Sequence, residues 1–407
     1  MKLLVVGHPF VIAYYQKKYA AMKQIEPNLQ LRLLVPKLHR HPFGTFRCAV
    51  HPELSREEVI PLASAFSQSH MTYLHNPVRM GGTLRSFRPD MIHVEEEPQA
   101  FITVETLALR DSLCPQVPVT IFTWDNLHRR RGFPLNVLKS RLRAHSLRRA
   151  AGIICGNREA EHLLRVREGY EGFSTVLPQY GLDPSDHVPG DEPQWKQQLG
   201  LMGSVVVGYA GRLIPEKGIR LLLGALAELG QSPWKLLLVG SGPLEEEIRE
   251  QWIPRFPGRI VHVRAVSLQE VPRYLRCLDV FVLASYAVAN WKEQFGLSLA
   301  QAMMLGVPSV ASSSGAIPEV AGPGALIFEE GNQKGLREAL QALLGSASRR
   351  SELGARAREF ALKHYTLAGV AAQYLAVFEE AQRLYASAGR APAHQAAAAE
   401  SSHTCHP

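Results

Sequence analysis

The chain has 407 residues, more than a single hydrophobic core usually serves, which predicts two domains of roughly 150 to 200 residues each. Its composition, 46% hydrophobic and 20% charged, is that of a globular protein and excludes a disordered or collagen-like chain. The formal net charge is +8, from 45 basic and 37 acidic residues, and no run of about eighteen apolar residues suggests a membrane span.

The cysteines and the first residues indicate the compartment. Five cysteines are scattered along the chain, and none forms a C-x-x-C pair, which argues against a disulfide framework and a zinc site. The apolar run near the start is followed at once by Lys17 and Lys18, so we expect a buried strand there and not a signal peptide. We therefore expect a cytoplasmic protein.

The first half of the chain alternates between strand-like and helix-like stretches. Strands are indicated by the runs KLLVVG, LQLRLLVP, DMIHV, VPVTIFTW, AGIICGN and STVLPQYG. Helical patterns lie between several of them, at residues 14–25, 100–110 and 157–166. This alternation predicts a parallel sheet covered by helices on both faces.

Acidic and amide side chains follow two of these expected strands. Glu95, Glu96 and Glu97 follow DMIHV, and because side chains alternate along a strand we expect at least one of them to face solvent. Asp125 and Asn126 follow VPVTIFTW. Our candidates for ligand binding or proton relay at these strand ends are Glu96, Glu97, Asp125 and Asn126.

A basic segment follows the second of these strands. Residues 129–149 contain eight Lys and Arg and no Asp or Glu, with apolar residues interleaved, which indicates a helix over residues 134–149. A solvated helix packed on the sheet and a helix that contacts an anionic membrane surface both fit this pattern. No RNA-reading aromatic motif or zinc-finger spacing is present, so we expect no nucleic-acid partner.

After the stretch GLDPSDHVPGDEPQ, which reads as a linker, the alternation of strands and helices restarts. From residue 348 to about 385 the pattern is helical, with an interruption near residues 364–366, and the low-complexity tail is expected to be disordered. We therefore expect four parts: a Rossmann-like domain at 1–185, a second Rossmann-like domain at 186–363, a helix at 364–388 that returns to the first domain, and a tail at 389–407.

Two strand–loop–helix elements of the second half have the residues of phosphate sites. In GYAGRLIPEKG the glycines allow close approach of a ligand, and two cations five residues apart could bind a diphosphate. VGSGPLEEEI has the same arrangement, although its glycines are also explained by a turn. The candidate residues are Gly211, Arg212, Lys217, Gly240, Ser241 and Gly242.

The stretch NWKEQFGLSLAQAMMLG combines an acid with an expected helix start. Glu293 precedes Phe295 and Gly296, and a helix is predicted from Leu297. The first amides of a helix can receive a phosphate, and a carboxylate can accept hydrogen bonds from hydroxyls. Gln301 lies a little over one turn into the helix, roughly 7 Å from its start.

A cationic phosphate loop, a hydroxyl-accepting acid, a helix start and a further glycine loop, in this order, resemble the retaining nucleotide-sugar glycosyltransferases of family 4. That family has the GT-B fold, an α/β architecture in which two doubly wound Rossmann-like domains face each other across a cleft. The resemblance is specific over residues 205–328 and looser over the first half. It implies transfer of a sugar from a nucleoside-diphosphate donor to an acceptor hydroxyl with retention, without a metal.

The resemblance also implies roles for single residues. The positions of Arg212 and Lys217 hold the donor pyrophosphate, and that of Glu293 contacts the transferred sugar. The amides at Phe295, Gly296 and Leu297 lie against sugar and phosphate, and Gly7, after the first strand, lies near the diphosphate. The resemblance leaves the acceptor open; a lipid-linked acceptor, a polysaccharide and a small molecule all fit.

The chain departs from the family at two positions. Where the family has a second glutamate for the ribose hydroxyls, this chain has Gln301, which keeps one acceptor but loses the charge. Where many members have a histidine, it has Trp124; together with the W-x-E-Q-F-G loop this is typical of a bacterial subgroup. His93 lies within an expected strand and fits the core better than catalysis.

These departures leave an alternative, a nucleotide-sugar-binding protein with impaired catalysis. A nicotinamide oxidoreductase is excluded because no G-x-G-x-x-G follows the first strand.

Overall fold

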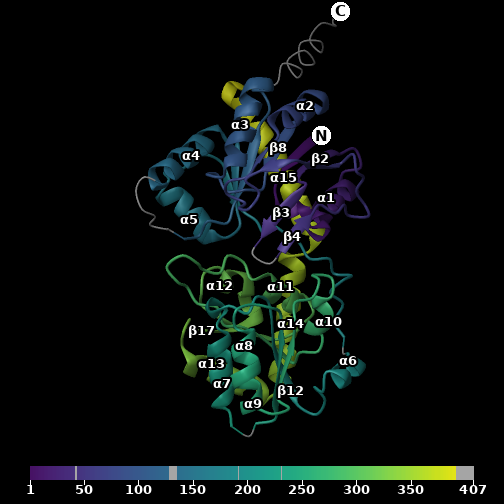
Figure 1. Ribbon diagram of the computed structural model, residues 1–407, viewed down its shortest axis with the longest axis vertical. Helices are drawn as coiled ribbons and strands as arrows, with labels where there is room; N and C mark the ends of the chain where they lie inside the picture. Colours follow the sequence, from purple (N-terminus) through teal and green to yellow (C-terminus); the bar gives the residue numbers. More distant parts are fainter. Residues whose placement is uncertain (42–43, 128–134, 191, 231, 391–407) are drawn as a thin grey trace, which may run out of the picture. The chain divides into compact units, whose positions relative to one another are not determined.

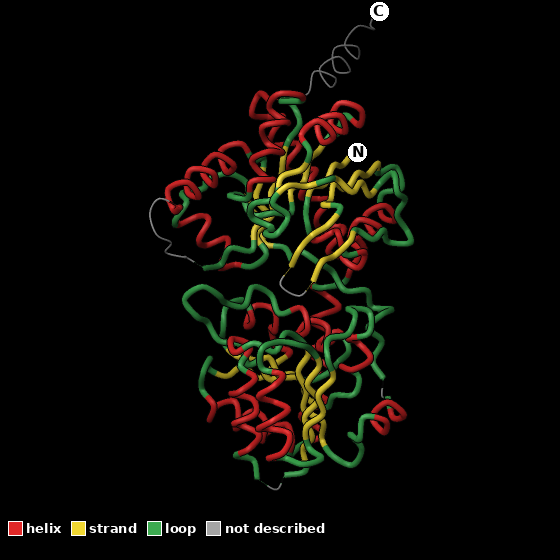
Figure 2. Tube along the Cα trace, in the orientation of Figure 1, coloured by secondary structure: helices red, strands yellow, loops and turns green. Residues whose placement is uncertain are grey.

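The computed structural model describes residues 1–41, 44–127, 135–190, 192–230 and 232–390. They form two compact units. Residues 1–156 and 160–180, together with the chain from residue 370 on, make the first unit, whereas residues 157–159 and 181–369 make the second. In each unit helices flank a sheet on both sides (Figure 2).

The first unit is built on a seven-stranded parallel sheet with the strand order β11-β10-β9-β8-β1-β2-β5. The strands are β1 Lys2–Val6, β2 Gln30–Pro36, β5 Val59–Leu62, β8 Met91–Val94, β9 Val119–Thr123, β10 Gly152–Cys155 and β11 Ser174–Val176. Most are short runs of buried apolar residues, because both faces of a parallel sheet are covered. Strand β5 was not predicted from the sequence.

Helices and two hairpins complete the first unit (Figure 1). They are η1 Pro9–Val11, α1 Ala13–Ile25, α2 Pro77–Phe87, α3 Phe101–Leu113, α4 Leu135–Arg149, α5 Arg158–Val166, α15 Leu367–Tyr385 and η5 Ala386–Arg390. The hairpins pair β3 Leu38–His41 with β4 Gly44–Arg47 and β6 Ser64–Ala65 with β7 Leu74–His75.

The side chains of β8 show how the two faces are covered. Ile92 and Val94 belong to the core cluster that includes Met80 of α2 and Leu107 of α3. His93, between them, points to the other face and packs against Phe378 of α15, with 5.1 Å between ring centroids. The two-residue period of the strand thus buries one apolar layer on each face.

The second unit is built on a six-stranded parallel sheet with the strand order β14-β13-β12-β15-β16-β17. The strands are β12 Val205–Ala210, β13 Trp234–Val239, β14 Ile260–Val263, β15 Val280–Leu283, β16 Ser309–Ser312 and β17 Ala325–Phe328. The helices are α6 Pro193–Gln198, η2 Pro215–Lys217, α7 Ile219–Ala227, α8 Glu245–Glu247, η3 Ile248–Trp252, α9 Ile253–Arg255, α10 Val271–Leu275, α11 Leu297–Met304, α12 Ile317–Ala321, η4 Gly322–Gly324, α13 Gln333–Leu344 and α14 Ala347–His364.

Each sheet has one place where the chain order reverses direction. In the first unit this switch point lies between β1 and β8, and in the second between β12 and β15. Loops that leave two such neighbouring strands diverge to opposite faces and leave a crevice at the carboxyl ends, where open α/β sheets bind ligands. The two switch points are therefore the places to look for a site.

The predicted interruption of the last helical stretch is confirmed. Helix α14 ends at His364 and α15 begins at Leu367. The hydroxyl of Thr366 accepts a hydrogen bond from the N–H of Gly369 at 3.2 Å, as an N-cap residue does. Among the described residues no helix is both long and apolar enough to cross a membrane.

Candidate functional site

The switch point of the second unit brings together the cations and the acid that the sequence singled out. Arg212 lies in the loop after β12, and Lys217 is the last residue of the short helix η2. Glu293 comes from the loop after β15, and its carboxylate accepts a hydrogen bond of 2.6 Å from Lys217 Nζ. The pair is partly enclosed, since the Lys217 and Glu293 side chains are 13% and 8% exposed. Arg212 is exposed.

Two further side chains fix this ion pair. Ser285, directly beyond β15, donates its hydroxyl to Glu293 Oε2 at 2.9 Å. The Lys217 ammonium lies 5.1 Å from the centroid of the Trp291 ring, a cation–π distance. Neither Ser285 nor Trp291 was among the sequence candidates. Lys217 and Glu293 are thus held in place by the protein itself, which leaves a preformed charge pair at the carboxyl ends of the strands.

Close backbone packing explains two glycines around this pair. Gly218 has φ +71°, and a Cβ there would lie 1.9 Å from the carbonyl oxygen of Ala284, at the end of β15. Gly315 has φ +53°, and a Cβ would lie 2.2 Å from the carbonyl oxygen of Glu293. Both positions require a left-handed backbone and the absence of a side chain. They bring the loops of β12, β15 and β16 against one another.

The other predicted glycine loops have mainly a packing role. The N–H of Gly211 donates to Val239 and that of Gly240 to Val263, so these amides complete the ends of the sheet. A Cβ at Gly240 would lie 1.8 Å from the carbonyl oxygen of Gly211. Ser241 accepts a hydrogen bond from the N–H of Ala265.

Gly242 donates its N–H to Glu245 Oε1 at 2.8 Å, a capping contact at the start of α8. The amides of Gly211, Gly240 and Gly242 are therefore not directed at a ligand.

The start of helix α11 completes the site. Gly296 has φ +86° and forms the N-cap, and no backbone carbonyl of a described residue receives the N–H of Gly296 or Leu297. Phe295 precedes them and packs edge-on against Tyr365. Gln301 is 2% exposed, and its side-chain nitrogen has no hydrogen-bond partner among the described residues. A buried unpaired amide is costly, which fits a hydrogen-bond partner supplied by a ligand.

The switch point of the first unit carries acids in place of cations. Gly7 follows β1, and a Cβ there would lie 3.0 Å from the Phe10 ring. His8 comes next; both its N–H, at 2.7 Å, and its ring Nδ1, at 2.6 Å, contact Glu96 Oε1. Tyr73 donates its hydroxyl to the same oxygen at 2.8 Å. Glu96 thus fixes the orientation of the His8 imidazole.

Glu95 lies deeper, in a fully buried cluster. Lys18 and Tyr19 of α1 both donate to its carboxylate, and His93 Nε2 lies 3.4 Å from it. The Lys18 ammonium is 3.7 Å from the Tyr374 ring centroid of α15. Burial by itself would raise the pKa of Glu95, but the charge of Lys18 and the hydrogen bonds from His93 and Lys18 outweigh it and lower the pKa to about 2. His93 is fully buried, which confirms the core interpretation.

Glu97 is held by the next strand. Its carboxylate accepts hydrogen bonds from the Thr123 hydroxyl at 2.5 Å and from the Trp124 N–H at 2.9 Å. Burial and the nearby charge of Asp125 raise the pKa of Glu97 to about 7. Asp125 itself is paired with Arg143 at 3.0 Å. The raised pKa brings protonation of the Glu97 carboxylate close to neutral pH.

The expectation that one of the three consecutive acids faces solvent is wrong. Glu95 and Glu96 are buried and Glu97 is half-buried. The alternation of a strand does not apply to them because β8 ends at Val94, and each carboxylate has its own set of partners.

Trp124 and Asn126 also point into the fold. The Trp124 indole N–H donates to Gln179 Oε1 at 2.8 Å, and its ring covers Gly156, where a Cβ would lie 2.0 Å from it. Asn126 is 3% exposed. Trp124 thus fills space beside the acids. Its hydrogen bond to Gln179 also ties it to one of the last residues before the chain enters the second unit.

The basic segment presents fewer free cations than its sequence suggested. Residues 128–134 lie outside the described residues, and α4 spans Leu135–Arg149. Arg143 is 7% exposed and contacts Asp125 and Glu168, so it faces the interior and not a membrane. Arg149 is paired with Asp111 at 2.9 Å. Arg141 and Arg148 remain exposed.

The contacts that the sequence did not reveal join residues far apart in the chain. Lys18 is 77 positions from Glu95, and Lys217 is 76 positions from Glu293, although Lys217 and Glu293 were each candidates. Among the described residues no three His, Cys, Asp or Glu side chains are grouped as ligands of a metal ion.

Comparisons with known proteins agree with this arrangement. Residues 191–360 match the family described as glycosyl transferases group 1. Spore coat protein SA of Bacillus subtilis is 27% identical over 199 residues, 46% of this chain and 52% of that protein. The MMP α-(1→4)-mannosyltransferase of Mycolicibacterium hassiacum is 31% identical over 237 residues, 55% of each chain. The matched regions span about half the length of these curated relatives.

The solved structures cover more of the chain. HepE of Anabaena, crystallised with UDP, superposes with a TM-score of 0.73 at 18% identity and covers 93% of this chain and 100% of its own. Sucrose-phosphate synthase of Thermosynechococcus elongatus gives 0.71 at 17% identity, with 93% and 98% covered. Residues 191–360 thus match the glycosyl transferases group 1 family, and the chain has the GT-B fold of two Rossmann-like domains.

Proposed function

We propose that the protein is a retaining glycosyltransferase, which moves a sugar from a nucleoside-diphosphate sugar to an acceptor hydroxyl. The observation that carries the proposal is the Lys217–Glu293 pair, 2.6 Å apart, at the switch point of the second unit. Arg212 lies in the same βα loop, and the start of α11 follows Glu293. Cations and free helix amides suit a diphosphate, whereas the carboxylate suits sugar hydroxyls or a cationic anomeric centre.

These residues bind different parts of the donor. Arg212 and Lys217 bind the pyrophosphate together with the amides of Gly296 and Leu297. Glu293 accepts hydrogen bonds from the transferred sugar. The buried amide of Gln301, which has no partner among the described residues, takes the ribose hydroxyls. The UDP bound by HepE supports a nucleoside diphosphate as the ligand class of this fold.

In the reaction the bond between the anomeric carbon and the phosphate oxygen breaks, and the acceptor oxygen bonds to the same face of that carbon. The acceptor proton passes to the departing phosphate. Arg212, Lys217 and the helix start stabilise the negative charge that develops on that phosphate, as fixed cations and dipoles do in a preorganised site. The charge of Glu293 stabilises the electron-poor anomeric carbon. We propose that these groups replace a metal, so turnover should survive excess chelator.

The acceptor is proposed to bind the first unit, near the carboxyl ends of β1 and β8. Glu96 with His8, Glu97, Asp125 and Asn126 are the polar groups there. A lipid-linked acceptor would suit a peripheral position on the inner face of the membrane, with Arg141 and Arg148 of α4 as the contact. Co-sedimentation with anionic liposomes checks this: an Arg141→Gln, Arg148→Gln variant should bind less than the wild type, and equal binding would remove the membrane contact.

A thermal-shift panel of UDP, GDP, ADP and CDP tests the donor site. One diphosphate should raise the melting temperature clearly more than the others and more than inorganic phosphate, because ligand binding stabilises the folded state. An absence of any shift would contradict the proposal. The matching nucleotide-sugar then separates a transferase from an impaired binding protein: a transferase should release nucleoside diphosphate slowly into water, whereas a binding protein should release none.

A further inference from the structure

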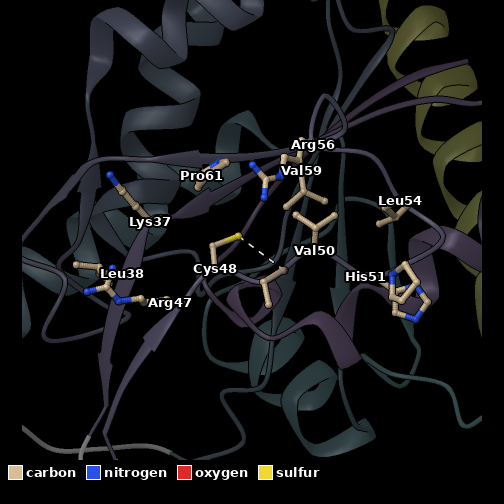
Figure 3. A pocket seen from close by; sticks show the side chains of 12 residues that line it. Lys37, Leu38, Arg47, Cys48, Val50, His51, Leu54, Arg56, Val59 and Pro61 are labelled. Carbon is tan, nitrogen blue, oxygen red and sulfur yellow. Dashed lines mark hydrogen bonds between the residues drawn. The ribbon is translucent and has the colours of Figure 1, made fainter.

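A pocket in the first unit has no place in the proposed reaction. It lies at the edge strand β5, where Val59 and Pro61 line it, and residues 37–38 and 47–52 with Leu54 and Arg56 form its walls (Figure 3). Its volume is about 780 Å³. Pockets that hold small molecules usually measure 300 to 1,000 Å³, so this one suits a ligand of modest size.

The walls of the pocket carry positive charge. Lys37, Arg47 and Arg56 line it, and no Asp or Glu does. In the part of the chain that the structure describes, none of these three side chains has an ion pair. Leu38 and Arg47 are cross-strand partners of the β3–β4 hairpin, so the hairpin presents an apolar and a cationic side chain side by side. Three unpaired cations around one cavity attract an anion.

The acids next to the pocket have other partners. Glu58 is paired with Lys23 and accepts the N–H of Ser55 at 2.7 Å. Glu53 accepts a hydrogen bond from Gln24 at 2.9 Å. The pocket also contains a thiol, but burial raises the pKa of Cys48 to about 11, so it adds no negative charge at neutral pH. No carboxylate among the lining residues therefore neutralises the three cations.

Part of the pocket lining is apolar. Val59 is fully buried and Leu54 is 7% exposed, which gives a closed hydrocarbon floor. Val50 is half-buried, and Leu38 is 37% exposed at the rim. Phe, Tyr and Trp are absent from the residues that line this pocket.

A buried glutamine holds the wall in place. Gln16 of α1 is fully buried and donates its amide to the carbonyls of Phe10 at 2.6 Å and Ala49 at 2.7 Å. Its amide oxygen accepts the N–H of His51 at 2.8 Å. The segment between β4 and β5 is thus fixed before any ligand arrives, which lowers the entropy cost of binding.

We propose that this pocket binds a phosphate group carried on an apolar chain. The guanidinium groups of Arg47 and Arg56 suit phosphate oxygens, and the floor of Val59, Leu54 and Val50 suits a hydrocarbon. The phosphate can come from a lipid or from a free phosphorylated metabolite, and both share this chemistry. The inference does not depend on the proposed transfer reaction, whose donor residues all lie in the second unit.

Isothermal titration calorimetry with three matched probes tests the pocket on the full chain. Geranyl phosphate carries both features, inorganic phosphate lacks the tail, and geraniol lacks the charge. The wild type should bind geranyl phosphate at least about tenfold more tightly than either of the others, because a charge-assisted contact and a buried tail each contribute about 1.4 kcal/mol or more.

Two double variants test the role of the pocket arginines, one inside the pocket and one outside it as the control. Arg47→Gln with Arg56→Gln should weaken geranyl phosphate binding at least about tenfold. Arg79→Gln with Arg85→Gln, two exposed arginines on α2 outside the pocket, removes the same charge and should leave binding unchanged. A Leu38→Asn change should weaken geranyl phosphate but not inorganic phosphate. Circular dichroism melts should show that all variants fold.

The possible outcomes distinguish a phosphate on an apolar chain from a free phosphate, and they show which half of the inference fails. Equal binding of geranyl and inorganic phosphate would overturn the apolar half of the inference and indicate a site for free phosphate. Equal binding of geraniol, or equal loss in both double variants, would overturn the charged half. A nucleoside-diphosphate thermal shift measured on the same samples reports on the second unit, so failure of the pocket is distinguishable from failure of the proposed transferase.

Discussion

The switch points of the two sheets have the same topology and different charged groups. In the first unit the chain leaves β8 with three carboxylates, and Glu95, Glu96 and Glu97 each have partners inside the protein. In the second unit it leaves β12 with Arg212 and Lys217. The topology thus determines where a site lies, whereas the residues placed there determine which charge it can bind.

The two switch points also differ in whether their buried polar groups already have partners inside the protein. Glu95 is surrounded by Lys18, Tyr19 and His93, so its cluster is complete without a ligand. At the other switch point the amide nitrogen of Gln301 is buried without a partner among the described residues. We read the first cluster as structural and the second as incomplete until a donor is bound, and this difference can be tested.

Glu95→Gln should have the largest effect on stability. It leaves the buried Lys18 ammonium without its counter-charge, and removing one partner of a buried ion pair costs about 3 to 5 kcal/mol. Urea unfolding followed by circular dichroism measures this. The control is a Lys18→Met, Glu95→Leu double variant, which removes both charges and should lose less. A double variant with a lower free energy of unfolding than Glu95→Gln would contradict a simple charge pair.

The Glu95 carboxylate should also make the free energy of unfolding depend on pH. The pKa of Glu95 is lowered to about 2, below its value in the unfolded chain, so its stabilising effect is present above about pH 4.5 and is lost as pH falls toward 2. The difference in unfolding free energy between wild type and Glu95→Gln should therefore shrink by about 3 kcal/mol over that range. A difference that stays constant between pH 5 and 2 would argue against it.

Gly218→Ala should disrupt the second switch point specifically. Its Cβ would lie 1.9 Å from the carbonyl oxygen of Ala284, so the loop of η2 must move away from β15. Gly258 has a similar φ, +73° against +71°, but no atom within 4 Å of its Cβ position. We expect Gly218→Ala to cost at least about 2 kcal/mol more than Gly258→Ala, because only the former adds a clash to the backbone strain. Equal melting temperatures would show that the loops are not tightly packed.

The smallest expected effects separate Gln301 from Glu293. Gln301→Glu should tighten nucleoside-diphosphate binding by about 1 to 2 kcal/mol and change turnover less, because ribose hydroxyls do not change charge in the reaction. Glu293→Gln should lower turnover more than it weakens binding. Binding from titration calorimetry and turnover from nucleotide release give the two numbers for each variant. The same pattern in both variants would mean that the two residues do not face different parts of the donor.

Local signals in the sequence predicted most of the fold. The break between α14 and α15 was visible because Thr366 is a capping residue, and the strands of both sheets were visible as short apolar runs. The hairpins β3–β4 and β6–β7 and the strand β5 were missed, because residues 37–75 contain many polar residues and no clear period. The pocket at β5 lies in that missed region.

The candidate site was predictable only in part. The positions of Arg212, Lys217 and Glu293 followed from a resemblance, but the contact between Lys217 and Glu293 depends on the pairing of β12 with β15, which no local pattern contains. The solvent exposure expected of the consecutive acids was wrong because the strand ended one residue before them. In both cases the deciding contacts join residues more than seventy positions apart or lie beyond the end of a regular element.

The central claim is that the cations of the second switch point carry out sugar transfer. The most direct test is the initial rate of nucleoside-diphosphate release from the matching nucleotide-sugar, with Arg249→Ala as the control for an exposed arginine of the same unit whose partner is its neighbour Glu250. Arg212→Ala and Lys217→Ala should each reduce turnover by at least about a hundredfold, and the control should not. Near-wild-type turnover in Lys217→Ala would contradict the assignment.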